Sequence, residues 1–143
     1  MHFISGGAFN GKRKWVKKQY PEYTAWLSAY ENSVWPTPSE QLTGTVVLEG
    51  IEAWVKKEID PAISTDILLD RMRYKLEQWL DWEQQETSHL LILIGTDISK
   101  GIVPIGKTER LQRDVTGWLY QILASRAERV DRLWYGIAET LKK

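Results

Sequence analysis

The sequence predicts an α/β fold in which a mainly parallel β-sheet is flanked by helices. Short apolar segments alternate with longer segments of helical periodicity, which is the pattern of strands and the helices that cover them. The segment Leu90–Ile94 is apolar at every position, as expected of a strand buried on both faces of a sheet. A glycine-rich turn also follows the first apolar segment and precedes a helical pattern, which is typical of a strand–loop–helix unit.

Five strands are predicted from short segments rich in β-branched and apolar residues. They cover residues 2–5, 25–29, 45–48, 89–95 and 131–137. Three helices are predicted from apolar residues at helical spacing, over residues 12–20, 68–80 and 111–123. Residues 31–44 contain Pro36, Pro38 and Gly44 among polar residues, so they are predicted to form a loop.

Length and composition limit the possible classes of protein. At 143 residues, with 43% hydrophobic residues, the chain is predicted to form a single domain over residues 1–143. Lys plus Arg equal Asp plus Glu at 19 each, so we expect neither nucleic acid nor a membrane as partner. Cysteine is absent, which excludes disulfides and thiolate chemistry. Because there is also no long apolar segment, we expect a cytoplasmic protein.

The glycine-rich turn contains the pattern Gly-x-x-x-x-Gly-Lys. In such a loop, backbone N–H groups turn around a polyphosphate, the lysine adds positive charge, and the next helix presents its N-terminus. We therefore predict a P-loop that binds GTP or ATP, with Lys12 as its catalytic residue. The predicted nucleotide-binding residues of the loop are Gly6, Gly7, Ala8, Phe9, Asn10, Gly11, Lys12 and Arg13. From the pattern alone, the alternative is an ordinary glycine-rich turn.

Arg13 stands where this loop usually has a serine or threonine whose hydroxyl helps to hold Mg²⁺, and a guanidinium cannot ligate a metal. Any Mg²⁺ would then depend on acidic residues at the carboxyl ends of the strands, where ligands of parallel sheets bind. Glu49 and Asp97 follow two predicted strands. We predict both as Mg²⁺ ligands, and Glu49 also as a nucleotide-binding residue. The alternative is that each is a helix cap or a solvated group.

Two ends of the chain together resemble the adenosylcobinamide kinase/adenosylcobinamide-phosphate guanylyltransferase family of cobalamin biosynthesis. The segment 101–104 reads Gly-Ile-Val-Pro, and residues 113–121 follow the family's Arg-Asp-x-x-Gly-x-x-Asn-Gln pattern with Tyr120 in place of asparagine. Residues 5–12 are similar to the family's phosphate loop, and residues 46–54 to its strand that ends in Asp-Cys-Leu-Thr-x-Trp. By this resemblance, Glu49 replaces a nucleotide-site aspartate and Asp97 replaces a glutamate.

The resemblance implies a P-loop enzyme that phosphorylates a corrinoid alcohol and then transfers GMP through a histidine. No histidine lies between Trp26 and Glu49, where the family carries that nucleophile. We therefore expect the kinase reaction to be kept and the guanylyltransferase half to be lost. His2 and His89 are expected to be structural. The resemblance also implies a homo-oligomer, and the eight tryptophans of the chain suit core or subunit contacts.

Two other functions stay open at this point. A degenerate, non-catalytic paralogue would keep the fold as a nucleotide-binding regulator or as a subunit of another enzyme. Arg13, Glu49 and the missing histidine favour it. An unrelated binding module with a coincidental glycine-rich turn is the third possibility, and the agreement over residues 101–104 and 113–121 counts against it.

Overall fold

The computed structural model describes residues 1–8, 10–32, 34–98 and 106–143. Six strands form one sheet in the order β2-β3-β4-β1-β5-β6. Their bounds are β1 His2–Gly6, β2 Ala25–Ser28, β3 Thr45–Glu49, β4 Leu90–Thr96, β5 Arg129–Trp134 and β6 Ile137–Lys142. The first five strands are parallel to one another, and β6 pairs with β5 in the antiparallel direction. The predicted α/β fold with a mainly parallel sheet is confirmed.

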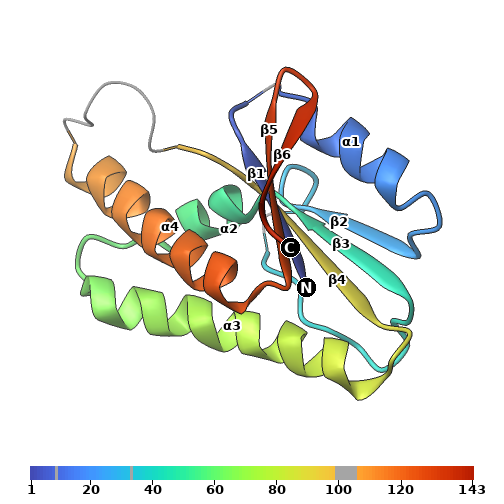
Figure 1. Cartoon of the computed structure of the whole chain (residues 1–143). Helices are drawn as coiled ribbons and strands as arrows, with labels where there is room; N and C mark the ends of the chain where they lie inside the picture. The colour runs from blue at the N-terminus through green and yellow to red at the C-terminus, as the bar shows by residue number, and fades with distance from the viewer. Residues whose placement is uncertain (9, 33, 99–105) are drawn as a thin grey trace.

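Helices cover the two faces of the sheet unequally (Figure 1). The helix α1 (Lys12–Gln19) lies on one face, and α2 (Ile51–Glu58), α3 (Thr65–Gln85) and α4 (Lys107–Arg126) lie on the other. Alternate residues of the strands enter two separate cores, because successive side chains of a strand point to opposite faces. Ile4 and Ile94 pack on the α1 side, whereas Phe3 and Leu93 pack on the side of α2, α3 and α4. None of these helices is long and apolar enough to cross a membrane.

Three tryptophans fasten the predicted loop 31–44 to the larger core. The indole N–H of Trp54 donates to Asn32 O at 2.9 Å, and that of Trp79 donates to Pro36 O at 2.8 Å. A third indole, of Trp82, donates to Leu42 O at 3.1 Å. The three rings are buried, so each combines apolar packing with one directed hydrogen bond. The expected core position of the tryptophans is confirmed for these three and for the buried Trp35, whereas Trp118 is exposed.

Two features of the fold differ from the sequence prediction. Residues 131–137, predicted as one strand, are divided by a turn at Tyr135 and Gly136, which both have positive φ. This turn reverses the chain and adds β6. The helix α2 was not predicted; it has eight residues and follows β3 with only Gly50 between them. Residues 101–104, which carry part of the family resemblance, lie outside the described residues.

Candidate functional site

The predicted phosphate loop connects β1 to α1 at the carboxyl edge of the sheet. Gly6 ends β1, and a Cβ at Gly6 would lie 2.6 Å from Leu133 O of the neighbouring strand β5. Gly11 has φ +84° and directly precedes α1. Both positions require glycine, the first because of the close backbone approach and the second because of the left-handed conformation. The structure therefore requires glycine at these two positions of the predicted loop, and phosphate binding by the loop stays a prediction.

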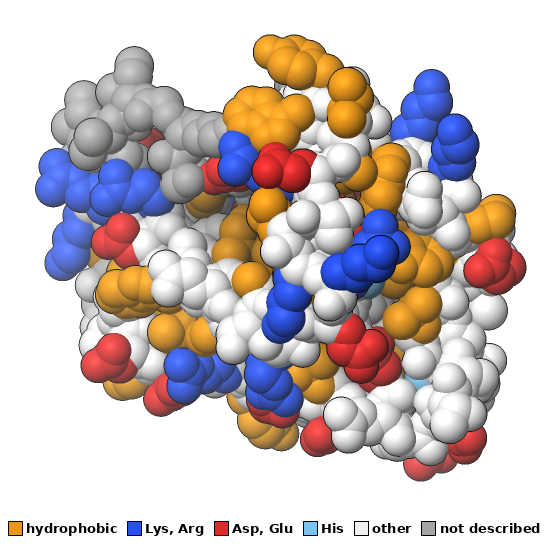
Figure 2. All heavy atoms as spheres, in the orientation of Figure 1, with side chains coloured by type: hydrophobic (Ala, Val, Ile, Leu, Met, Phe, Trp, Pro, Cys, Tyr) orange, Lys and Arg blue, Asp and Glu red, His pale blue; other side chains and the backbone are white. Residues whose placement is uncertain are grey.

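The loop is also fastened to the β5–β6 hairpin. The backbone N–H of Gly136 donates to Asn10 O at 3.0 Å. Beyond this contact, the tip of the hairpin projects from the molecule, and hydrophobic side chains gather over it (Figure 2). The large exposed side chains of this hairpin include Tyr135, which is 87% exposed, and Ile137, which is 71% exposed. The hairpin that sequence analysis did not predict thus contacts the predicted phosphate loop.

Lys12 is the first residue of α1 and is almost fully buried. Its Nζ donates to Gly7 O at 2.7 Å, so the loop's own backbone accepts the ammonium hydrogen bond. Burial lowers the pKa of Lys12, while the negative charges of Glu52 and Glu49 act in the opposite direction. No side chain of the described residues caps the N-terminus of α1. A buried lysine beside uncapped helix N–H groups is the arrangement that binds phosphate in loops of this type.

A cavity of about 730 Å³, here called the loop cavity, opens on the α1 side of the sheet. It brings together most of the predicted nucleotide-binding residues with Ile94 and Thr96 of β4. The described residues that line it are Ala8, Asn10, Gly11, Lys12, Arg13, Lys14, Tyr30, Glu49, Ile94 and Thr96. Gly6 and Gly7 flank this set in the chain, and Phe9 lies outside the described residues. Its volume lies within the range of about 300–1,000 Å³ that is usual for small-molecule sites.

Arg13 and Glu49 are paired across the loop cavity. Arg13 Nε donates to Glu49 Oε2 at 2.8 Å, and Arg13 Nη2 donates to Oε1 at 2.5 Å. Trp26 Nε1 also donates to Oε1 at 3.2 Å. Burial raises the pKa of Glu49, but the hydrogen bonds from Arg13, Trp26 and Ser28 outweigh burial and hold the pKa below its ordinary value. Both carboxylate oxygens therefore accept hydrogen bonds from Arg13, so a Mg²⁺ ion at Glu49 would compete with the guanidinium for this carboxylate.

Asp97 follows β4, and its backbone N–H donates to Gly6 O at 2.8 Å. Its side chain lines a different cavity from that of Glu49. The structure therefore does not bring the two predicted Mg²⁺ ligands into one cavity, and their shared role stays a prediction. Within the described ranges, no group of three or more His, Asp or Glu side chains is arranged to hold a metal ion.

Glu52 is a buried carboxylate that sequence reasoning did not select. It lies in the first turn of α2, where its Oε1 accepts a hydrogen bond from Tyr30 at 2.6 Å and its Oε2 has no hydrogen-bond partner among the residues that the structure describes. Burial, and then the hydrogen bond to Glu52, raise the pKa of Tyr30 to about 12. The position of Glu52 in the sequence could have identified it, because the first turn of a helix after a parallel strand faces the edge of the sheet where ligands bind.

The two histidines lie in buried contacts outside the loop cavity. His2 Nε2 is 2.5 Å from Asp131 Oδ2, and its Nδ1 is 2.6 Å from the Tyr20 hydroxyl. His89 stacks on Trp82 and its Nδ1 is 2.7 Å from Trp82 O. These contacts agree with the structural roles expected for both histidines.

Comparison with known proteins assigns the chain to a family. The family profile described as cobinamide kinase/cobinamide phosphate guanyltransferase matches residues 31–141, which begin after the phosphate loop. The chain is also similar to the bifunctional adenosylcobalamin biosynthesis protein CobP of Pseudomonas aeruginosa, with 38% identity over 52 residues. That similarity covers 36% of this chain and 30% of the relative, so it spans less than a third of that protein. The chain belongs to the cobinamide kinase/cobinamide phosphate guanyltransferase family.

Proposed function

We propose that this protein is a nucleotide-dependent kinase of cobalamin biosynthesis, which transfers the γ-phosphoryl group of GTP or ATP to the hydroxyl of a corrinoid alcohol. The hydroxyl oxygen attacks the γ-phosphorus and the bond to the bridging oxygen breaks. A phosphate ester, a nucleoside diphosphate and a proton result. The observation that carries this proposal is the buried Lys12 at the uncapped start of α1, within a cavity lined by the glycine-rich loop.

Phosphoryl transfer depends mainly on positioning and on neutralisation of charge. In the loop cavity, Lys12 and Arg13 supply positive charge, and Mg²⁺ is the expected further cation. Glu49 and Asp97 stay its predicted ligands, although Glu49 is paired with Arg13 in this structure. When bound, Mg²⁺ would neutralise phosphate charge. The chain's own contribution is to hold the phosphates with Lys12 and the loop backbone.

The guanylyltransferase half of the family's activity is proposed to be lost. Transfer of GMP by the route that the resemblance implies needs a histidine nucleophile after the second strand, and the sequence has none between Trp26 and Glu49. His2 and His89 are held in buried contacts elsewhere. Labelling with α-³²P GTP tests this point, because no label should pass to the protein or to cobinamide phosphate.

A specific observation favours the second candidate, a non-catalytic nucleotide-binding subunit or regulator. The ion pair of Arg13 and Glu49 lies across the loop cavity and engages the carboxylate that would approach the metal. Homo-oligomerisation is a further expectation for either candidate. Light scattering coupled to size-exclusion chromatography measures it directly.

The test of the proposed function is calorimetric titration with GTP and with ATP, each with and without Mg²⁺. Lys12→Ala should weaken nucleotide binding at least about tenfold, because a charge-assisted contact to phosphate is lost. Lys18→Ala is the matched control, since it removes the same charge from an exposed position of the same helix. Unchanged nucleotide affinity in Lys12→Ala would mean that the glycine-rich loop does not bind the nucleotide. Binding without transfer of label from γ-³²P GTP to cobinamide would favour the non-catalytic candidate.

A further inference from the structure

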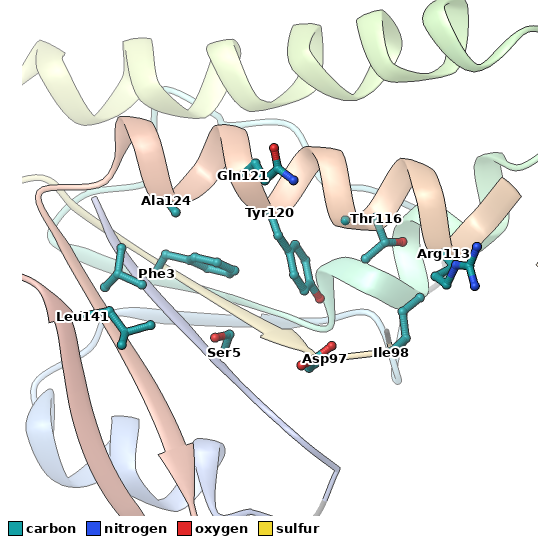
Figure 3. A pocket seen from close by; sticks show the side chains of 12 residues that line it. Phe3, Ser5, Asp97, Ile98, Arg113, Thr116, Tyr120, Gln121, Ala124 and Leu141 are labelled. Carbon is teal, nitrogen blue, oxygen red and sulfur yellow. The ribbon is translucent and has the colours of Figure 1, made fainter. Parts of the chain in front are cut away.

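A second cavity, here called the α4 cavity, lies on the other face of the sheet from the loop cavity. It has a volume of about 430 Å³ and lies between α4 and the strands β1, β5 and β6 (Figure 3). Phe3, Val130 and Leu141 line it from the strands, and Arg113, Thr116 and Tyr120 line it from α4. This volume lies within the range of about 300–1,000 Å³ that is usual for small-molecule sites.

The two cavities approach each other at the carboxyl ends of β1 and β4. Thr96 lines the loop cavity, whereas its neighbour Asp97 lines the α4 cavity. Ser5 also lines the α4 cavity, directly before the first glycine of the phosphate loop. The hydrogen bond from Asp97 N to Gly6 O holds these two strand ends together. A phosphate donor on one side of these ends and an acceptor on the other would meet there, as group transfer requires.

The α4 cavity contains a buried hydroxyl that has no hydrogen-bond partner within the described part of the chain. Thr116 is 1% exposed, and its Oγ1 makes no hydrogen bond with any described residue. A buried hydroxyl left without a partner is costly, so most such groups are satisfied by protein, water or a ligand. Figure 3 shows Thr116 on the same side of α4 as Arg113, with Asp97 and Ile98 on the facing chain segment. The α4 side of the cavity thus carries the hydroxyl of Thr116 and the guanidinium of Arg113, which also donates to Asp114 at 3.3 Å, while Phe3 and Leu141 form an apolar wall.

We propose that the α4 cavity binds the hydroxyl-bearing arm of the acceptor alcohol. An amide-linked propanol arm, as cobinamide carries, presents an amide, a methyl group and a hydroxyl. Thr116 and Arg113 meet its polar groups and Phe3 and Leu141 meet its methyl group, while the corrin ring stays outside. The inference rests on the proposed kinase function, because only then is an acceptor required beside the phosphate loop.

The test uses two variants that alter the α4 cavity without removing a contact of the protein. Thr116→Val deletes the unpartnered hydroxyl and keeps the shape of the side chain. Gly117→Leu fills space, since a Cβ at Gly117 meets nothing within 4 Å. The matched control is Thr108→Val, the same substitution at an exposed position of α4. Thermal unfolding midpoints of the three variants should not be lower than that of the wild-type protein.

The probes are cobinamide and the small amide N-acetyl-1-aminopropan-2-ol, titrated in the presence of a GTP analogue that cannot transfer its γ-phosphate. Thr116→Val should weaken the binding of both about tenfold, as expected for one hydrogen bond to a buried group. Gly117→Leu should abolish it, and Thr108→Val should leave it unchanged. All three variants should bind the nucleotide analogue as the wild-type protein does.

The outcomes separate the inference from the function on which it rests. Wild-type affinity for cobinamide in Gly117→Leu would overturn the assignment of the α4 cavity. If the wild-type protein binds the nucleotide but neither probe, the acceptor class is wrong. If the wild-type protein binds no nucleotide, the proposed kinase function is wrong, and nucleotide titration of the wild-type protein alone shows this.

Discussion

Arg13 and Glu49 form a two-point ion pair between α1 and the end of β3, with donor–acceptor distances of 2.8 and 2.5 Å. The guanidinium of Arg13 thus binds Glu49 in addition to lying beside the predicted phosphate site. It neutralises the acidic residue that the sequence predicted as a ligand of Mg²⁺. Arg13 stands in place of the usual hydroxyl residue, and Glu49 stands in place of the usual acid at the end of the strand. The two changes are physically coupled, because each side chain satisfies the charge and the hydrogen bonds of the other.

The first prediction concerns this pair. Arg13→Ser releases Glu49 and restores a hydroxyl beside Lys12, so Mg²⁺ should strengthen nucleotide binding by at least about fivefold more than in the wild-type protein. Stability should fall by about 1 kcal/mol, because a largely buried carboxylate loses its partner at a site where the arginine is 48% exposed. Calorimetry with and without Mg²⁺ measures the first effect and urea unfolding the second. Lys18→Ser serves as control, and an unchanged response to Mg²⁺ would argue against a metal at this position.

The second prediction concerns the buried carboxylate of Glu52. Its charge acts on Lys12 and should repel the phosphates of a metal-free nucleotide. Glu52→Gln keeps an oxygen that accepts from the Tyr30 hydroxyl, so the fold should be retained. Metal-free GTP should then bind about threefold more tightly, which corresponds to a weak repulsion across a partly screened site. Glu58→Gln, at the other end of α2, should have no effect; equal changes in both variants would point to net charge rather than to the site.

The third prediction compares two adjacent glycines of the loop. Gly6→Ala should lower stability by about 3 kcal/mol or more, since its Cβ would lie 2.6 Å from the backbone oxygen of Leu133. Gly7→Ala should cost about 1 kcal/mol or less, because the nearest atom to its Cβ is the flexible amide Nδ2 of Asn10, at 2.8 Å. Chemical unfolding of both variants checks the difference. Similar losses in the two would mean that β1 and β5 can separate at little cost.

The fourth prediction is acid sensitivity at the buried contact of His2 with Asp131. Burial lowers the pKa of His2 below 6.5, against the opposing effect of Asp131. Burial raises the pKa of Asp131, but hydrogen bonds from Thr140, His2 and Arg129 outweigh it and keep the pKa below 3.8.

Both shifts give stability the same sign of dependence on pH. Below pH 6.5 the unfolded chain binds a proton at His2 that the folded protein resists, so stability falls as the pH falls towards the folded pKa. The contribution of Asp131 is present above pH 3.8 and is lost as the pH falls through its folded pKa. Asp131→Asn should reduce stability at pH 7 by about 2 kcal/mol and remove the loss of stability below pH 3.8 that protonation of Asp131 causes. Asp70→Asn, on the exposed side of α3, should do neither when unfolding is followed between pH 3 and 7.

Local patterns in the sequence were sufficient for much of the fold. The continuous apolar segment at 90–94, the helical spacing in α3 and α4, and the glycine-lysine turn after β1 each depend on neighbouring residues. They predicted the α/β class and the position of the phosphate loop. The β5–β6 turn was missed, because the sequence around Tyr135 and Gly136 reads as a continuous apolar strand.

The sequence by itself determined the strand–loop–helix unit and the charge and glycine residues it carries, since these follow from period and residue type. Only the tertiary structure decided which residues these side chains contact. Arg13 meets Glu49 across 36 positions, and Asp97 opens into a different cavity from Glu49. The physical reason is that packing between distant segments sets the strand order and the direction in which each side chain points. That packing placed β4 between β1 and β3, and it buried the Thr116 hydroxyl where no described residue hydrogen-bonds to it.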